Sequence, residues 1–209
     1  DSFNQAPMLD KKVESGELPA VEKRIPEEPC VVKPREEIGD YGGTLETATI
    51  NINSWGADIM LMDSFNGFVK PNAEANKLVP NFAKKVEVSD DMTTYTFYLR
   101  KGVRWSDGHP FTVDDIVFWY EDVLLNKKLT PIVGEMFKAN GEVMDLTKID
   151  NYTFEIKFEK TQPFFLKRTV HQIGWNFLYP KHYLKQFHPK YTDKDILDKK
   201  IQAEGYDHW

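Results

Sequence analysis

The chain has 209 residues, of which 41% are hydrophobic and 29% charged, a composition typical of a globular protein rather than a disordered one. Its formal net charge is −6, from 27 basic and 33 acidic residues, which argues against a nucleic-acid-binding surface. No stretch approaches the ~18 continuous apolar residues of a membrane-spanning helix, and the first ten residues carry no signal-peptide pattern.

The first 46 residues are predicted to be mostly irregular. Residues 6–16 form a short predicted helix, because Pro7 suits a first turn and Gly16 suits a helix end. Four prolines between positions 19 and 34 favour extended backbone, either as a charged linker or as a segment lying along a surface. A turn at residues 40–43 leads into a predicted strand at 44–50.

Two segments, residues 94–100 and 151–158, alternate apolar and polar side chains as half-buried strands do. The apolar face of the two segments consists of Tyr95, Phe97, Leu99, Tyr152, Phe154, Ile156 and Phe158. Such strands predict an antiparallel sheet packed on one side. Residues 55–69 are predicted as a helix that enters a turn at Gly67. Further helices are predicted at residues 164–171 and after Pro180, and residues 77–89 read as a turn followed by a strand.

The stretch LRKGVRWSDGHPFTVDDIVFWYEDVL, residues 99–124, predicts a strand, a tight turn and a helix. Gly108 suits the turn, and Thr112 is placed to cap the helix with Asp115 completing a capping box. Asp114 and Asp115 also favour the positive end of the helix dipole. These carboxylates therefore have a structural explanation that needs no general-acid role.

Placing this helix at about 100° per residue separates its faces. Trp119 falls on the flank of the core stripe, and Phe118 points nearly opposite to it, toward the face that should be solvated. Either another element covers Phe118 or the ring lines a cleft. The predicted core stripe consists of Val113, Ile116, Val117, Tyr120, Val123 and Leu124.

Signals for catalysis or metal binding are missing from the sequence. The five histidines form no HExxH pattern, and neither a G-x-S-x-G motif nor a phosphate-binding loop is present. Cys30 is the one cysteine, so no internal disulfide can form. The sequence therefore predicts no metal, no cofactor and no catalytic set.

Residues 78–124, LVPNFAKKVEVSDDMTTYTFYLRKGVRWSDGHPFTVDDIVFWYEDVL, resemble the signature region of the family 5 solute-binding proteins of bacterial ABC importers. The shared pattern is a Val-Pro turn, a strand ending in Leu-Arg-x-Gly-Val, an Asp-Gly turn, Pro-x-Thr and a helix, although Phe82 stands where Leu is usual. Residues 16–45 look like the N-terminal extension of a longer-chain branch, and residues 149–165 and 179–184 also resemble family segments.

This resemblance implies an α/β fold: a lobe of the type II periplasmic-binding-protein kind, with mixed sheets flanked by helices. Family members are much longer, so the chain is expected to be the N-terminal portion, lacking the second lobe. Residues 1–46 would be the first part of subdomain I, with the N-terminal extension and first strand. Residues 47–160 would form subdomain II, and residues 161–209 would return to subdomain I.

The resemblance also implies candidate ligand contacts. In related receptors the helix after the Asp-Gly turn presents an aromatic side chain to the ligand cleft, and Phe118 matches that position. The segment after the first strand faces the ligand too, which here gives Asn53, Ser54 and Trp55. Further candidates, near the return to subdomain I, are Trp175 and Asn176.

The implied function is an extracytoplasmic receptor that binds an oligopeptide or oligosaccharide and delivers it to the ABC permease in the membrane. It would be a monomer without cofactor, periplasmic or extracellular, and tethering through a removed N-terminal signal stays open. Two alternatives remain: a carbohydrate-active enzyme, and an interaction module not involved in transport.

Overall fold

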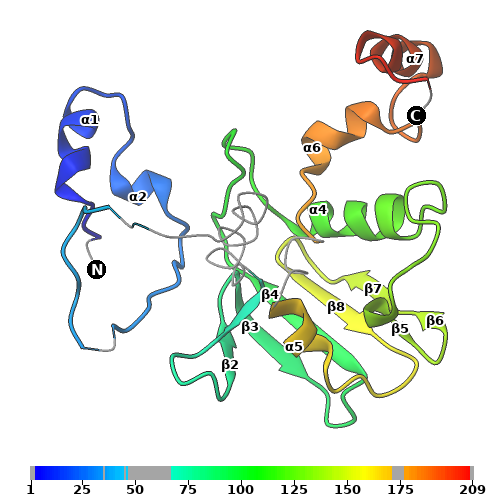
Figure 1. The fold of residues 1–209 in the computed structure, drawn as a ribbon, viewed down its shortest axis with the longest axis horizontal. Coiled ribbons are helices and arrows are strands. Elements are labelled where there is room, and N and C mark those ends of the chain that lie inside the picture. The colour runs from blue at the N-terminus through cyan, green and yellow to red at the C-terminus, as the bar shows by residue number, and fades with distance from the viewer. Residues whose placement is uncertain (1–2, 35, 45, 47–66, 171–176, 208–209) are drawn as a thin grey trace.

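The computed structural model describes residues 3–34, 36–44, 46, 67–170 and 177–207. The described part is built around an antiparallel four-stranded sheet in the order β3-β4-β8-β7 (Figure 1). Its strands are β3 (Ala83–Val88), β4 (Thr94–Leu99), β7 (Asp145–Lys148) and β8 (Thr153–Lys157). Strands β4 and β8 are neighbours, which confirms the antiparallel pairing predicted from their alternating side chains.

One face of this sheet forms the core. Phe97 and Phe154 lie opposite each other on β4 and β8, and both are fully buried. Their rings are stacked, with centroids 4.8 Å apart and an interplanar angle of 5°. Aromatic pairs of this kind contribute about 0.5–1.5 kcal/mol beyond their buried area. The alternating apolar residues of β4 and β8 therefore lie on one face of the sheet, where their aromatic rings pack together.

Helical elements on both flanks contribute to the same core. Helix α4 (Val113–Phe118) continues into the π-helical turn η3 (Trp119–Leu124), and helix α5 (Phe165–Val170) lies at the other end of the cluster. The ring of Phe165 is 5.0 Å from that of Tyr95 on β4. Helix α5 matches the helix predicted at 164–171.

The π-helical turn corrects the predicted phase of the helix. The amide of Leu125 donates to the carbonyl oxygen of Tyr120 at 3.0 Å, a bond that spans five residues instead of four. Trp119 precedes the two residues that this bond joins, and its ring lies in the core, 4.4 Å from that of Phe177. Trp119 is therefore a core residue that is 2% exposed, and not a flanking one.

The helix begins as predicted. The Thr112 hydroxyl accepts from the amide of Asp114 at 3.3 Å, and Asp115 Oδ2 accepts from the amide of Thr112 at 3.0 Å, which together complete a capping box.

Thr112→Ala is expected to lower the free energy of unfolding by about 1 kcal/mol, because the cap is lost. Urea-induced unfolding of the two proteins measures the difference. Thr112→Ser, which keeps the hydroxyl, should restore most of the loss. A curve for Thr112→Ala identical to that of the parent would show that the cap contributes nothing.

Short hairpins flank the sheet. Strand β1 (Val69–Pro71) pairs with β2 (Leu78–Pro80), and β5 (Lys138–Ala139) pairs with β6 (Glu142–Val143) after the 3₁₀ turn η4 (Glu135–Phe137). The segment at 78–80 is therefore a strand where the sequence predicted a turn.

The N-terminal segment contains the turn η1 (Pro7–Leu9) and helix α1 (Asp10–Glu14), which confirms the first predicted helix. A second short helix, α2 (Val21–Arg24), interrupts the extended backbone expected from the prolines. It fits between Pro19 and Pro26 and ends at Arg24, and the next residue, Ile25, is extended as residues before proline tend to be.

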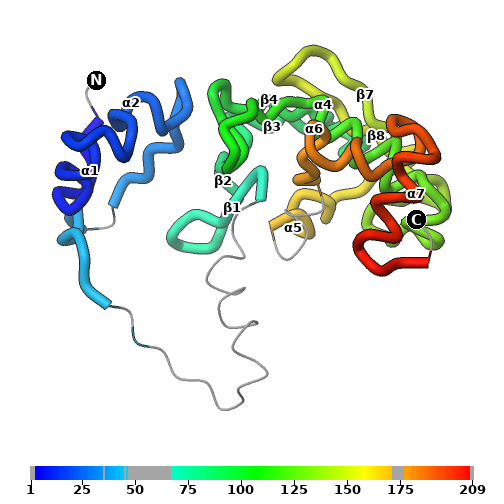
Figure 2. The backbone as a smooth tube through the Cα atoms, turned by 90° about the horizontal axis from the view of Figure 1, so that it is seen from above, coloured from blue at the N-terminus to red at the C-terminus, as the bar shows by residue number. Residues whose placement is uncertain are grey.

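The C-terminal segment contains α6 (Lys181–Leu184), η5 (Lys185–Phe187) and α7 (Lys194–Ala203). Helix α6 follows Pro180, as predicted. Both views place the N-terminal and C-terminal segments on opposite sides of the central sheet (Figures 1 and 2). The assignment of both segments to one subdomain stays a prediction.

Some predicted elements lie outside the described residues. They include residues 47–50 of the first predicted strand and residues 55–66 of the predicted helix. After the turn predicted at Gly67, Val69 begins strand β1. In the part of the chain that the structure describes, no helix is long and apolar enough to span a membrane.

Candidate functional site

The helix after the Asp-Gly turn is fixed at its first turn by a buried carboxylate. Asp115 is 3% exposed, and its two oxygens serve different partners. Oδ2 accepts from the amide of Thr112, and Oδ1 accepts from the amide of Lys181 at 2.9 Å. Asp115 therefore joins the start of α6 to the start of α4. This arrangement supports the structural role predicted for the carboxylate.

Phe118 lies on the face of α4 away from the core stripe, as the helical phase predicted, but its ring is only 2% exposed. The segment after η5 covers it: the ring centroid is 6.1 Å from that of His188 and 6.0 Å from that of Tyr191. The ring thus has packing partners within the chain. This burial corrects the expectation that Phe118 lines an open cleft and favours the alternative that another element covers it.

An ion pair with a buried carboxylate and a half-exposed lysine lies beside Phe118. Asp122 is 4% exposed, and it accepts from Lys190 Nζ at 2.8 Å and from the Tyr191 hydroxyl at 2.5 Å. Burial, the largest single influence, favours the neutral carboxyl, but the hydrogen bonds from Lys190 and Tyr191 outweigh it and lower the pKa of Asp122. The same contact raises the pKa of Lys190. Asp122 therefore anchors the 188–191 segment over the helix.

Asp122→Asn is expected to lower the free energy of unfolding by about 2 kcal/mol at neutral pH, because charge-assisted hydrogen bonds are lost while Lys190 stays half exposed to water. A lowered pKa means that this stabilisation is present above the unfolded value of about 3.9 and is lost as pH falls through the folded value.

Urea-induced unfolding of both proteins across pH 2–7 measures this, and the gap between them should close below about pH 4. Glu121→Gln is the matched control, because Glu121 is half exposed and lies 3.5 Å from Lys190. It should change stability by less than about 0.5 kcal/mol. A gap that stays constant down to pH 2 would contradict the role given to the charge of Asp122.

The other candidate ligand contacts, Asn53, Ser54, Trp55, Trp175 and Asn176, lie outside the described residues. The described flanks of their two segments nevertheless meet. A Cβ placed on Gly67 would lie 2.6 Å from the carbonyl oxygen of Thr169. The ring of Phe68 lies 5.3 Å from that of Phe177.

Gly67 and Phe68, which follow the first candidate segment, therefore pack against residues on either side of the second, Thr169 and Phe177. Sequence reasoning did not identify this junction. A glycine directly before a strand was the available signal, since it marks a close backbone approach.

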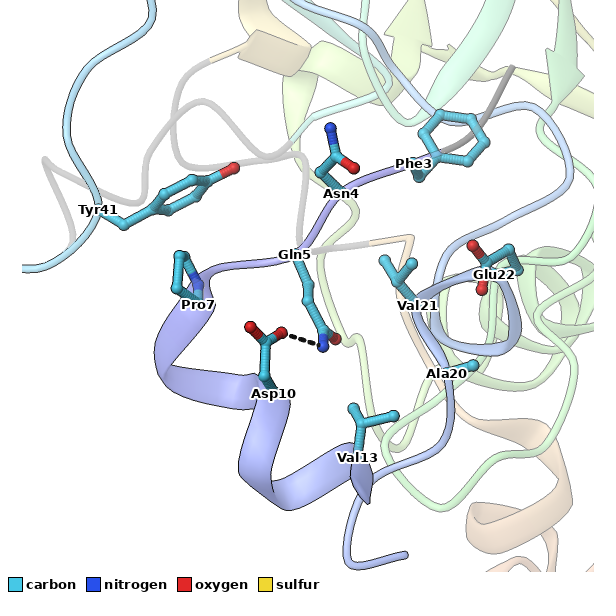
Figure 3. A pocket seen from close by; sticks show the side chains of 10 residues that line it. All are labelled: Phe3, Asn4, Gln5, Pro7, Asp10, Val13, Ala20, Val21, Glu22 and Tyr41. Carbon is cyan, nitrogen blue, oxygen red and sulfur yellow. Dashed lines mark hydrogen bonds between the residues drawn. The ribbon is translucent and has the colours of Figure 1, made fainter. Parts of the chain in front are cut away.

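A hollow of about 530 Å³ lies within the N-terminal segment (Figure 3). Two of its polar groups are paired with each other, because Gln5 Nε2 donates to Asp10 Oδ1 at 2.8 Å, and Arg24 donates to Gln5. Phe3, Val13 and Tyr41 are among its apolar lining. Nothing in this lining points to a ligand of a particular charge.

Two histidines meet at the Asp-Gly turn. The rings of His109 and His182 are stacked with centroids 3.9 Å apart, and His182 Nε2 lies 2.6 Å from Asp107 Oδ2. The hydrogen bond with His182 is the main cause that lowers the pKa of Asp107. Among the residues that the structure describes, no group of three or more histidines, cysteines and carboxylates could hold a metal ion.

The strand, turn and capped helix of this region also occur in known proteins. Residues 77–204 match the bacterial extracellular solute-binding proteins, family 5, in their middle region. The chain belongs to this family. The match runs from β2 to the end of α7, so it includes the four-stranded sheet, α4 and the segment that covers Phe118.

Curated relatives are considerably longer than this chain. The periplasmic alpha-galactoside-binding protein of Rhizobium meliloti (strain 1021) is 31% identical over 205 residues, which cover 88% of this chain and 29% of that protein. The oligopeptide-binding protein OppA of Salmonella typhimurium is 27% identical over 62% of this chain and 26% of its own length. The chain thus spans less than a third of the length of these relatives.

Solved structures give the same picture. An oligopeptide-binding protein OppA aligns with a TM-score of 0.82 and 37% identity over all of this chain and 32% of its own. The periplasmic binding protein MelB of Agrobacterium fabrum C58, solved in complex with stachyose, aligns with a TM-score of 0.68 and 30% identity. That alignment covers 96% of this chain and 33% of MelB. The predicted α/β fold of a partial solute-binding protein is confirmed.

Proposed function

We propose that the full-length protein containing this chain is an extracytoplasmic receptor that delivers an oligosaccharide to the permease of an ABC importer. The observation that carries the proposal is the family membership of residues 77–204, which include the whole four-stranded sheet and helix α4. In such a receptor this chain supplies part of one lobe, and closure on the ligand requires the remainder.

The substrate class is taken from two relatives that cover 88% and 96% of the chain. One is described as an alpha-galactoside-binding protein, and the other was solved with stachyose. Aromatic rings that stack on sugar faces, with polar neighbours that fix orientation, suit such ligands. Trp55 and Trp175, with Asn53, Ser54 and Asn176, are the proposed contacts on this side of the cleft.

An oligopeptide is the second candidate ligand. It is favoured by the OppA structure, which aligns over the whole chain with the TM-score of 0.82. A peptide would be held largely through main-chain hydrogen bonds, and the charged partner for its terminus would come from the remainder of the protein.

Calorimetric titration of the full-length receptor distinguishes these candidates. Raffinose and stachyose, with sucrose as the shorter control, should bind with micromolar or tighter affinity, and tri- to pentapeptides should not. Peptide binding without sugar binding would reverse the choice of substrate class. Turnover of any bound sugar would favour a carbohydrate-active enzyme, and failure to bind either class would favour an interaction module.

A further inference from the structure

A groove of about 870 Å³ lies between the extended residues 29–33 and the β1–β2 hairpin. This volume falls in the range of small-molecule sites, about 300–1,000 Å³. The groove is separate from the junction at Gly67 and Thr169 and from the cover over Phe118, since none of their residues lines it. We call it the basic groove.

The charge of its lining is unusual for a chain with a net charge of −6. Four cationic residues line the groove, Lys33, Lys70, Lys84 and Arg100, and no carboxylate does. Lys84 already pairs with Glu28 at 2.8 Å. Among the described residues, Lys33 and Lys70 have no carboxylate within ion-pair distance.

The carboxyl group of Glu28, next to the groove, lies in the same positively charged surroundings. The pKa of Glu28 is lowered, mainly through its hydrogen bond with Lys84, and the charges of Lys101 and Arg100 act in the same direction.

Most of the remaining lining is apolar. Val31 and Val32 are 81% and 63% exposed at one wall, and Val79 and Pro71 belong to the hairpin opposite. Exposed adjacent valines beside a concave surface mark a site for an apolar group, since isolated exposed apolar residues alone would need no explanation. Positive charge and apolar walls together match a ligand with a carboxylate and a hydrocarbon body.

The residues that lead into one wall and the hairpin that forms the other are held in place without a ligand. On one side, Arg100 donates to the carbonyl oxygen of Glu28 at 2.9 Å, and the amide of Glu27 donates to the carbonyl oxygen of Lys101 at 3.1 Å. Gly102 permits this approach, because a Cβ there would lie 2.9 Å from the amide nitrogen of Glu27.

On the other side, Asn72 Oδ1 accepts from the amides of Asn76 and Lys77 at 3.1 and 3.0 Å, which closes the hairpin loop. A site with prearranged walls loses less entropy when a ligand binds.

We propose that the basic groove is a second ligand site, which binds a small amphipathic carboxylate with its charge at Lys33 and Lys70 and its hydrocarbon part against Val31, Val32 and Val79. It is independent of the sugar or peptide cleft. The inference rests on the groove alone and stands whether or not the proposed transport function is correct.

Cys30 lines the groove and reports on it locally. The experiment measures its alkylation in the full-length protein by peptide mass spectrometry, with iodoacetamide, while octanoate, octanol or octylammonium is added below its micellar concentration. Octanoate should slow the reaction, and the other two should have much weaker effects. A Cys30 that does not react at all, or equal protection by all three compounds, would overturn the proposal.

Variants test whether Lys33 and Lys70 bind the carboxylate of octanoate. Lys33→Gln combined with Lys70→Gln should weaken octanoate protection about fivefold to tenfold, from the loss of two partly screened charges. Lys77→Gln combined with Lys127→Gln is the matched control outside the groove and should leave protection unchanged. Equal loss in both pairs would indicate a general charge effect and would contradict the site.

Two further measurements separate the alternatives. Sugar and peptide affinities of the Lys33→Gln, Lys70→Gln variant should match those of the parent, because these residues do not belong to the proposed cleft. The octanoate experiment does not depend on sugar or peptide binding, so its result holds even if the transport proposal fails. Protection of Cys30 by phosphatidylglycerol vesicles but not by octanoate would overturn the proposal in favour of a membrane surface.

Discussion

Phe118→Ala is expected to lower the free energy of unfolding by about 3 kcal/mol, at the lower end of values for buried phenylalanines. The ring is 2% exposed and packs on His188 and Tyr191, so its removal leaves a cavity between α4 and the C-terminal segment. Because these partners belong to the chain itself, ligand affinity of the full-length receptor should change by less than about twofold.

Urea-induced unfolding and calorimetric titration of the same variant measure the two effects. Phe164→Ala is the matched control, since this phenylalanine, which directly precedes α5, is 58% exposed, and it should change stability by less than about 0.5 kcal/mol. Normal stability with at least tenfold weaker ligand binding in Phe118→Ala would contradict this prediction and would show that the ring contacts the ligand.

Gly67→Ala is expected to lower the free energy of unfolding by about 1–3 kcal/mol, the usual cost of forcing an added group into a packed site. The new Cβ would lie 2.6 Å from the carbonyl oxygen of Thr169 and 3.2 Å from that of Val69. Both obstacles are backbone atoms, so the chain itself must move.

The same substitution is expected to weaken ligand binding at least tenfold, about 1.4 kcal/mol, if the proposed contacts at residues 53–55 and 175–176 are correct. The described residues that flank both sets of contacts meet at this junction, so a backbone shift there is expected to reach both sets.

Gly134→Ala is the matched control: its φ is −63°, and an added Cβ would approach nothing closer than 4.0 Å. Calorimetric titration of both full-length variants gives the comparison. Reduced stability of Gly67→Ala with unchanged affinity would show that the junction does not position the ligand contacts.

The sheet and the start of its helix could be predicted from the sequence by itself. The period-two alternation of Tyr95, Phe97 and Leu99 leaves one apolar face, and the matching face of residues 151–158 supplies its partner. Thr112 and Asp115 are short-range cap partners, so three consecutive peptide units were enough to locate the helix start. Short-range chemistry of this kind leaves a local signature in the sequence.

The surroundings of the candidate site could not be predicted, because they depend on contacts between residues that are far apart in the sequence. Periodicity placed Phe118 away from the core stripe, which is correct, but the segment that covers it lies 70 residues further along the chain. Asp122 has the pattern of a solvated residue, yet it is buried because Lys190 and Tyr191 reach it from the same distant segment. Trp119 is likewise buried by a distant part of the chain, because the ring of Phe177 packs on it.

The sequence by itself therefore determined the family, the strand faces and the helix cap, because each arises from residues that are neighbours along the chain. Only the tertiary structure decided which polar and aromatic residues are buried, where the segments flanking Gly67 and Thr169 meet, and that four cations gather at the basic groove. Burial and charge clustering depend on which distant segments pack together, and this packing is a property of the whole fold.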